Sequence, residues 1–225
     1  MNLSTIGLEG PNDFPTQSYE KIHATMVLHK DAFPDKWSEF VGTWKSVGIK
    51  FIALAQNDEI FTTSIKRGRG GASSYEDRYN QEYALFNFFV AGHSLLESLF
   101  YGLYIIASIK NPIEFPLTQK SIERVKPSIV RDKFSKNYET EQITKYITEI
   151  LTSSEYKESK KIRNTLIHRT MPSRTIQLST ERAIPDLWMI GENIPTDEQL
   201  TASRRYWYSQ VISNIMDKTI EFTDK

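Results

Sequence analysis

The chain has 225 residues, enough for one large domain to bury most of the apolar surface that its unfolded form would expose. Hydrophobic residues make up 39% of it and charged residues 25%, which excludes a disordered or collagen-like chain. It has no cysteine, which excludes disulfides, cysteine-ligated zinc or iron–sulfur sites and thiol nucleophiles. Its 28 basic residues balance its 28 acidic residues, so any contact with a polyanion requires a local basic cluster.

The N-terminal segment, residues 1–34, is rich in glycine, proline, asparagine and aspartate and shows little periodicity. This composition predicts an irregular arm, in which residues 23–29 can form a short strand. The first residues lack the basic start and apolar core of a signal peptide, so we expect a cytoplasmic protein. Residues 35–225 are expected to form a single helical domain.

Apolar residues between Trp37 and Leu54 recur at spacings of three and four, which predicts an amphipathic helix from about Asp35. Residues 64–74 combine glycine and serine with three positive charges and lack this spacing, so they are predicted to form a loop.

A second long helix is predicted from about Ser74 to Ile109, before the stop signal Asn111-Pro112. Between Glu82 and Lys110 its only charged residue is Glu97, and about 20 apolar residues suffice to span a bilayer. However, Asn87, His93 and Glu97 would lie near the bilayer centre, where a carboxylate alone costs about 2.5–3.5 kcal/mol. We therefore expect a buried central helix and no membrane contact.

Shorter helices are predicted over residues 118–125, 127–134, 139–151 and 154–169, with Ser153 and Ser154 as candidate N-caps of the last. Pro172 ends that helix, and two β-type runs, 175–178 and 187–190, predict a small hairpin-like insertion near residues 174–191. A final helix is predicted over residues 196–222. The expected fold is an all-α, up-and-down helical bundle with a long central helix and this small insertion.

One short motif carries the functional hypothesis: Arg163-Asn164-Thr165-Leu166-Ile167-His168. Its pattern of arginine, polar residue and histidine, late in a helical chain, resembles the HEPN superfamily, which includes many metal-independent ribonucleases. The resemblance covers roughly residues 75–222. Arg169 and Thr170 follow His168 where some active HEPN toxins carry a tyrosine.

The resemblance implies a homodimer in which two copies of the motif line one cleft that takes RNA or a nucleotide. It also implies a toxin–antitoxin or phage-defence setting, with a protein antitoxin as a possible partner. Arg163 and His168 are about 140° apart on an ideal helix, so one regular helix cannot point both side chains the same way, whereas Asn164 and His168 share a face.

The catalytic hypothesis assigns each of these residues a role. His168 takes the proton of a ribose 2′-hydroxyl, Arg163 stabilises charge on the phosphate, and Asn164 orients His168 or holds a phosphate oxygen. No metal or cofactor is required, and the expected products are a 2′,3′-cyclic phosphate and a 5′-hydroxyl. Positive side chains near the motif are expected to hold the substrate: Lys160, Lys161 and Arg169.

Glu97 is an auxiliary candidate, which can pair with Arg163 and orient it or form an ion pair with a different base. His93 and Glu97 form a His-x3-Glu pair, yet we expect a core histidine and no metal site because no further acid cluster lies nearby. Two other functions stay open: a HEPN-like dimer that binds nucleotide or RNA without cleaving it, and a helical scaffold for a protein partner.

Overall fold

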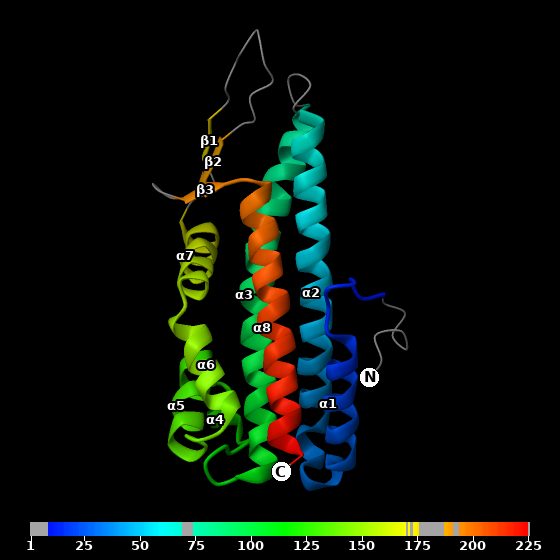
Figure 1. The fold of residues 1–225 in the computed structure, drawn as a ribbon, viewed down its shortest axis with the longest axis vertical. Helices are drawn as coiled ribbons and strands as arrows, with labels where there is room; N and C mark the ends of the chain where they lie inside the picture. Colours follow the sequence, from blue (N-terminus) through cyan, green and yellow to red (C-terminus); the bar gives the residue numbers. More distant parts are fainter. Residues whose placement is uncertain are drawn as a thin grey trace.

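The computed structural model describes residues 9–68, 74–169, 171, 173–175, 187–190 and 194–224. It confirms an all-α, up-and-down bundle with a long central helix (Figure 1). Along the chain the elements are α1 (Thr16–Leu28), the short 3₁₀ helix η2 (Lys30–Ala32), α2 (Pro34–Gly68), α3 (Tyr75–Lys110), α4 (Gln119–Ile122), α5 (Pro127–Asn137), α6 (Gln142–Thr152), α7 (Ser154–His168), β1 (Ser173–Thr175), β2 (Leu187–Ile190), β3 (Ile194–Thr196) and α8 (Glu198–Thr223).

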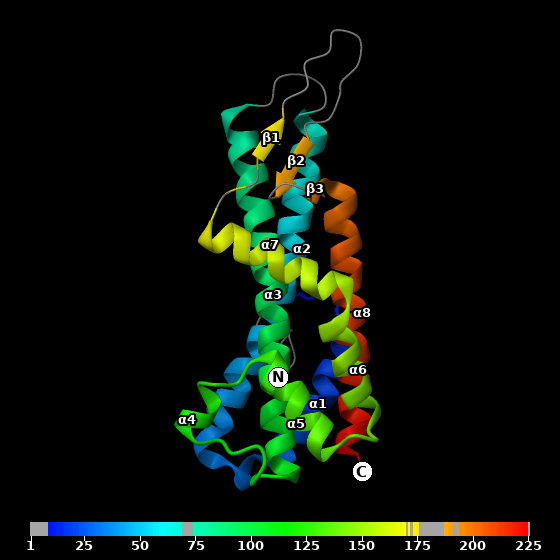
Figure 2. The ribbon, with the colours of Figure 1, turned by 90° about the vertical axis from the view of Figure 1, so that its left-hand side faces the viewer.

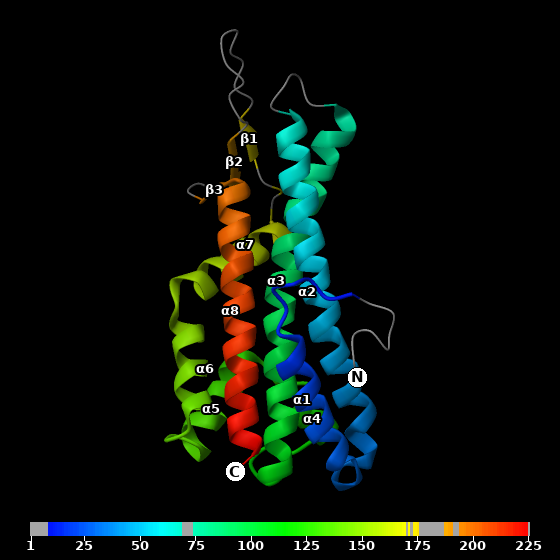
Figure 3. The same ribbon diagram turned by 45° about the vertical axis from the view of Figure 1, so that its right-hand side comes forward.

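The two longest helices, α2 and α3, run antiparallel along the length of the molecule, and α8 packs beside them (Figures 1 and 3). Gly102 of α3 faces the indole of Trp44 of α2, where an added Cβ would lie 3.3 Å from the ring. The absence of a side chain at Gly102 lets the two helices approach closely at this level.

The central helix α3 forms where the sequence predicts it. The Ser74 side chain accepts a hydrogen bond from the Asp77 N–H at 3.0 Å and caps the helix, which ends before Asn111-Pro112. By length and composition α3 is apolar enough to cross a membrane, and 67% of its most apolar window is buried inside the chain. That burial is typical of a core helix packed on nearly all sides.

The prediction of an irregular N-terminal arm is wrong for residues 16–28, which form α1 rather than a strand at residues 23–29. Tyr19, Ile22 and Met26 are buried on one face of this helix. Tyr19 donates its hydroxyl to the Trp44 carbonyl at 3.0 Å, and the Trp44 indole donates to the Tyr19 carbonyl at 3.1 Å. The packing of α1 against Trp44 therefore stabilises a helix that the local composition does not predict. Residues 1–8 lie outside the described residues.

The predicted loop over residues 64–74 is also wrong at its start, since α2 continues to Gly68. Ser64 and Ile65 are buried, and the Gln81 amide of α3 donates to the Ser64 carbonyl at 3.0 Å. Packing against α3 therefore keeps α2 helical beyond the residues that show regular apolar spacing. Residues 69–73 lie outside the described residues.

Helices α5 and α6 cover one side of the lower half of the bundle, and α7 runs across the long axis over α3 (Figure 2). The Ser153 hydroxyl accepts from the Tyr156 N–H at 3.2 Å, which caps α7 as predicted. The residues that α7 buries are Tyr156, Ser159, Ile162 and Leu166. The opposite face of α7 is left to solvent.

The insertion between α7 and α8 forms a small antiparallel sheet of order β1-β2-β3. In its register Ser173 pairs with Met189, and Ile190 pairs with Ile194. β2 matches the predicted run 187–190, whereas β1 overlaps the predicted run 175–178 only at Thr175. β3 was not predicted, and its last residue, Thr196, was expected to begin the last helix. That helix begins instead at Glu198, because the Asp197 side chain accepts from the Leu200 N–H at 2.8 Å and caps it. The residues between the first two strands, 176–186, lie outside the described residues.

Candidate functional site

The Arg163–Asn164 pair lies in the second half of α7. Arg163 donates from Nη1 to the Asn164 side-chain oxygen at 3.1 Å, and both residues are half-buried. The Nε of Arg163 is buried and has no hydrogen-bond partner within the described part of the chain. Arg163 therefore keeps one N–H donor that the described residues leave unpaired.

His168 is the last residue of α7 and is exposed to solvent. Among the described residues it makes no hydrogen bond or ion pair, and it does not contact Arg163. The half-buried position of Arg163 and the exposed position of His168 agree with the angle expected on one helix. Arg169 follows as the C-cap, its backbone N–H donating to the Thr165 carbonyl at 2.9 Å, and its side chain is also exposed.

The solvent face of α7 carries a row of polar and basic side chains. Lys157, Lys161, Asn164 and His168 follow one another at spacings of four, three and four residues, which places them along one side of the helix. The three charged or titratable members are exposed, and Asn164 is half-buried. We call these four residues the α7 row. Lys160, also exposed, lies beside it.

Glu97 pairs with His93 rather than with Arg163. Its Oε1 lies 3.6 Å from the Nε2 of His93, one turn earlier on α3. Its charge also acts on Lys50 of α2, whose ammonium donates to the Ser98 hydroxyl at 2.7 Å. Glu97 therefore lies beside a base other than Arg163, and this contact becomes an ion pair only when His93 is protonated.

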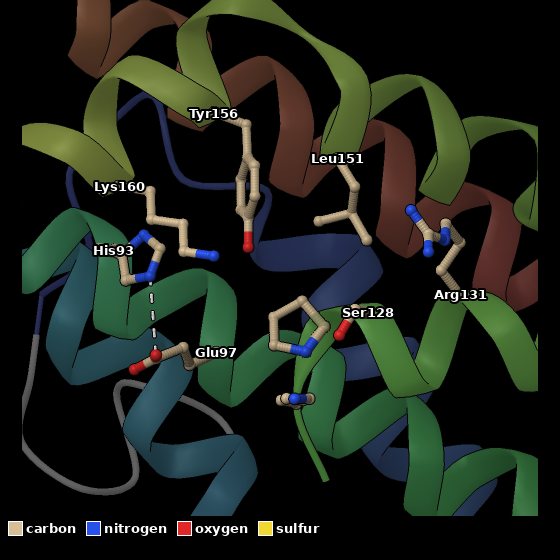
Figure 4. A pocket seen from close by; sticks show the side chains of 9 residues that line it. His93, Glu97, Ser128, Arg131, Leu151, Tyr156 and Lys160 are labelled. Atoms are coloured by element: carbon tan, nitrogen blue, oxygen red, sulfur yellow. Dashed lines mark ion pairs between the residues drawn. The ribbon is translucent and has the colours of Figure 1, made fainter.

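A cavity of about 320 Å³ opens where α3, α5, α6 and α7 meet (Figure 4). We call it the α3–α7 cavity. The ammonium of Lys160 and the hydroxyl of Tyr156 point toward its centre, and the His93–Glu97 pair forms one side. The residues that line it are His93, Glu97, Lys126, Pro127, Ser128, Arg131, Leu151, Tyr156 and Lys160.

Sequence reasoning identified Glu97 and Lys160 but missed the rest of this cavity. Lys126 and Arg131 carry no motif, and they come from a helix start that is distant in sequence from both α3 and α7. The one available signal was Pro127, which marks the first turn of a helix and hence a potential anion-binding end. Lys161 and Arg169, in contrast, do not line the cavity.

His93 is only 4% exposed, and its Nδ1 has no hydrogen-bond partner among the described residues. Burial lowers the pKa of His93, as do the nearby charges of Arg163 and Lys160, whereas Glu97 opposes them. The ring is therefore neutral at neutral pH, with one nitrogen able to donate and one able to accept. No cluster of three or more metal-ligating side chains occurs in the described ranges.

The lowered pKa of His93 predicts that the folded chain loses stability as the solution is acidified. Below its ordinary pKa of 6.5 the imidazole of the unfolded chain binds a proton that the buried imidazole resists. Acidification from about pH 7.5 to about 5.5, where histidine is the main titrating side chain, therefore favours unfolding. Urea unfolding of the wild type and of His93→Gln at both pH values measures this contribution.

We expect the loss of stability on acidification to be smaller for His93→Gln than for the wild type. His23, whose pKa burial also lowers, titrates in both proteins and cancels in the comparison. An equal loss in both proteins would show that His93 does not resist protonation in the folded chain.

Comparison of the chain with protein-family models, with curated proteins and with solved structures finds no significant match.

Proposed function

We propose that this chain is a metal-independent endoribonuclease of the HEPN type that acts as a homodimer. The observation that carries the proposal is the α7 row, in which His168 and Asn164 share the solvent face of one helix with two lysines. A chain with a formal net charge of zero needs such a local excess of positive charge to hold RNA.

The position of His168 explains why the proposal includes a second copy of the chain. Among the described residues the exposed His168 has no charged partner that would help it stabilise the reacting phosphate. Arg163 cannot do so on the same helix, because the two side chains are about 140° apart. A two-fold pairing of α7 helices brings the arginine of one copy toward the histidine of the other and gathers both around one phosphate.

In this mechanism neutral His168 accepts the proton of the ribose 2′-hydroxyl as the 2′-oxygen attacks the adjacent phosphorus. Arg163 donates hydrogen bonds to the phosphate oxygens as negative charge grows on them. The bond from phosphorus to the 5′-oxygen breaks, which leaves a 2′,3′-cyclic phosphate and, after protonation, a 5′-hydroxyl. Lys160, Lys161 and Arg169 hold the flanking phosphates.

The proposal includes a cytoplasmic location and a toxin–antitoxin or phage-defence setting with a protein antitoxin as partner. The toxin–antitoxin or phage-defence setting and the antitoxin partner come from the family resemblance alone.

The test is incubation of the purified chain with single-stranded and structured RNA, in the presence of a metal chelator. We expect cleavage of the RNA to products with 2′,3′-cyclic phosphate ends. DNA of the same sequence should stay intact, because it lacks the 2′-hydroxyl. Intact RNA, or equal cleavage of DNA, would contradict the proposal. Sedimentation of the same sample as a monomer under conditions of activity would contradict the dimeric site.

A further inference from the structure

The α3–α7 cavity is a candidate binding site that shares only Lys160 with the residues of the proposed nuclease. About 12 Å of helix rise separates Lys160, at the cavity, from His168, at the end of α7. We propose that the cavity binds a small phosphate monoester, with the phosphate held by Lys126, Lys160 and the start of α5 and the ester group packed on the apolar wall.

More basic than acidic side chains line the cavity. Lys126 and Lys160 make no ion pair within the described part of the chain, whereas Arg131 is bound to Asp132 at 2.7 Å. The one lining carboxylate, Glu97, is 45% exposed, and it faces His93 and the charge of Lys50. Two ammonium groups therefore remain to bind an anion, and a phosphate monoester is close to a dianion at neutral pH.

The N-terminus of α5 adds to this positive field. Lys126 is its N-cap, Pro127 and Ser128 begin it, and no side chain caps its first turn. Pro127 has no N–H, and the Ile129 and Val130 N–H groups donate to the Lys126 carbonyl. The Ser128 N–H and the dipole of the helix start are therefore the backbone groups that favour an anion at this point. The Ser128 hydroxyl lines the same cavity and can donate to a phosphate oxygen (Figure 4).

A second observation points to a ligand independently of the helix end. The ring of His93 lines the cavity and is 4% exposed, yet its Nδ1 lacks a hydrogen-bond partner among the described residues. Buried polar atoms are nearly always hydrogen-bonded in folded proteins, so an unpaired one beside a cavity marks a place where a bound group completes the structure.

Another part of the lining is apolar and can receive a compact organic group. Pro127, Leu151 and the ring of Tyr156 form this wall, and the Tyr156 ring is tilted by 37° against His93 at a centroid distance of 5.8 Å. A volume of about 320 Å³ lies at the small end of ligand pockets, which run from roughly 300 to 1,000 Å³. The site therefore fits a single phosphate with a small body rather than a length of RNA.

Calorimetric titration of the full chain with phenyl phosphate tests the proposal, with inorganic phosphate and phenol as comparison ligands. We expect phenyl phosphate to bind more tightly than inorganic phosphate and phenol to bind far more weakly than either. Lys126→Gln and Lys160→Gln should each weaken phenyl phosphate binding by roughly tenfold, since each removes a charged donor. Lys120→Gln, which removes an exposed lysine of α4 outside the cavity, is the control for charge alone.

Three results would overturn the assignment: no binding of phenyl phosphate, equal affinities of phenyl phosphate and inorganic phosphate, or equal weakening by Lys120→Gln and the two cavity variants. Circular dichroism of each variant checks that the fold is retained. Because the titration contains no RNA, its outcome does not depend on whether the chain cleaves RNA.

Discussion

RNA cleavage is expected to fall by about 10²–10⁴-fold when His168 is replaced by alanine, the range that a general base typically contributes. The fold should be unaffected, because His168 is exposed and forms no hydrogen bond or ion pair with the described residues. The measurement is the initial rate of cleavage of a single-stranded RNA in the presence of a chelator, at matched protein concentration and with thermal unfolding of both proteins recorded.

His29→Ala is the matched control, since it removes an exposed histidine at the end of α1 and far along the chain from α7. It should cleave at the wild-type rate. Arg163→Ala should lose activity as well, and Arg78→Ala, which removes an exposed arginine of α3, should not. A His168→Ala protein that cleaves like the wild type would remove the basis of the catalytic hypothesis. A His29→Ala protein as slow as His168→Ala would show that the loss is not specific to the motif.

Gly92→Ala is expected to destabilise the fold by about 1–3 kcal/mol, the usual cost of overpacking a core. An added Cβ at Gly92 would lie 2.5 Å from Cε2, 2.6 Å from Cζ and 2.8 Å from the hydroxyl oxygen of Tyr208. The Tyr208 side chain is fully buried and has no room to withdraw, and its burial raises the pKa of its hydroxyl to about 12. The substitution therefore forces α8 away from α3 near His93.

Gly42→Ala is the matched control, because Gly42 is also helical and an added Cβ there meets nothing within 4 Å. It should stabilise the chain by up to about 1 kcal/mol, the difference in helix propensity between alanine and glycine. Chemical denaturation of both variants measures the difference.

Tyr208→Leu removes the clashing atoms, so it should cost less stability in the Gly92→Ala background than in the wild type. Additive effects of the two changes would show that the contact does not limit packing.

The sequence alone predicted most of the helices because their signals are local. The long α3 follows from the absence of a proline between Ser74 and the stop signal Asn111-Pro112, and α7 follows from its serine N-cap and from Pro172 beyond its end. These determinants act within a few residues of one another. They need no knowledge of what the helix packs against.

The errors occurred where distant contacts decide the local structure. Helix α1 is held by reciprocal hydrogen bonds between Tyr19 and Trp44, and the end of α2 by the bond from Gln81 to Ser64. Neither pairing is visible in a short window of sequence. The third strand, Ile194–Thr196, similarly depends on β2 as its partner.

The same division applies to the candidate sites. The sequence was enough to place the motif Arg163-Asn164-x3-His168 on a late helix and to show that Asn164 and His168 share a face of it, because helical periodicity fixes these relations. The meeting of Lys126 and Arg131 with Lys160 around one cavity depends instead on the tertiary structure. Those contacts arise from the crossing of α7 over α3 and the position of α5, which are set by side-chain packing between elements far apart in the chain.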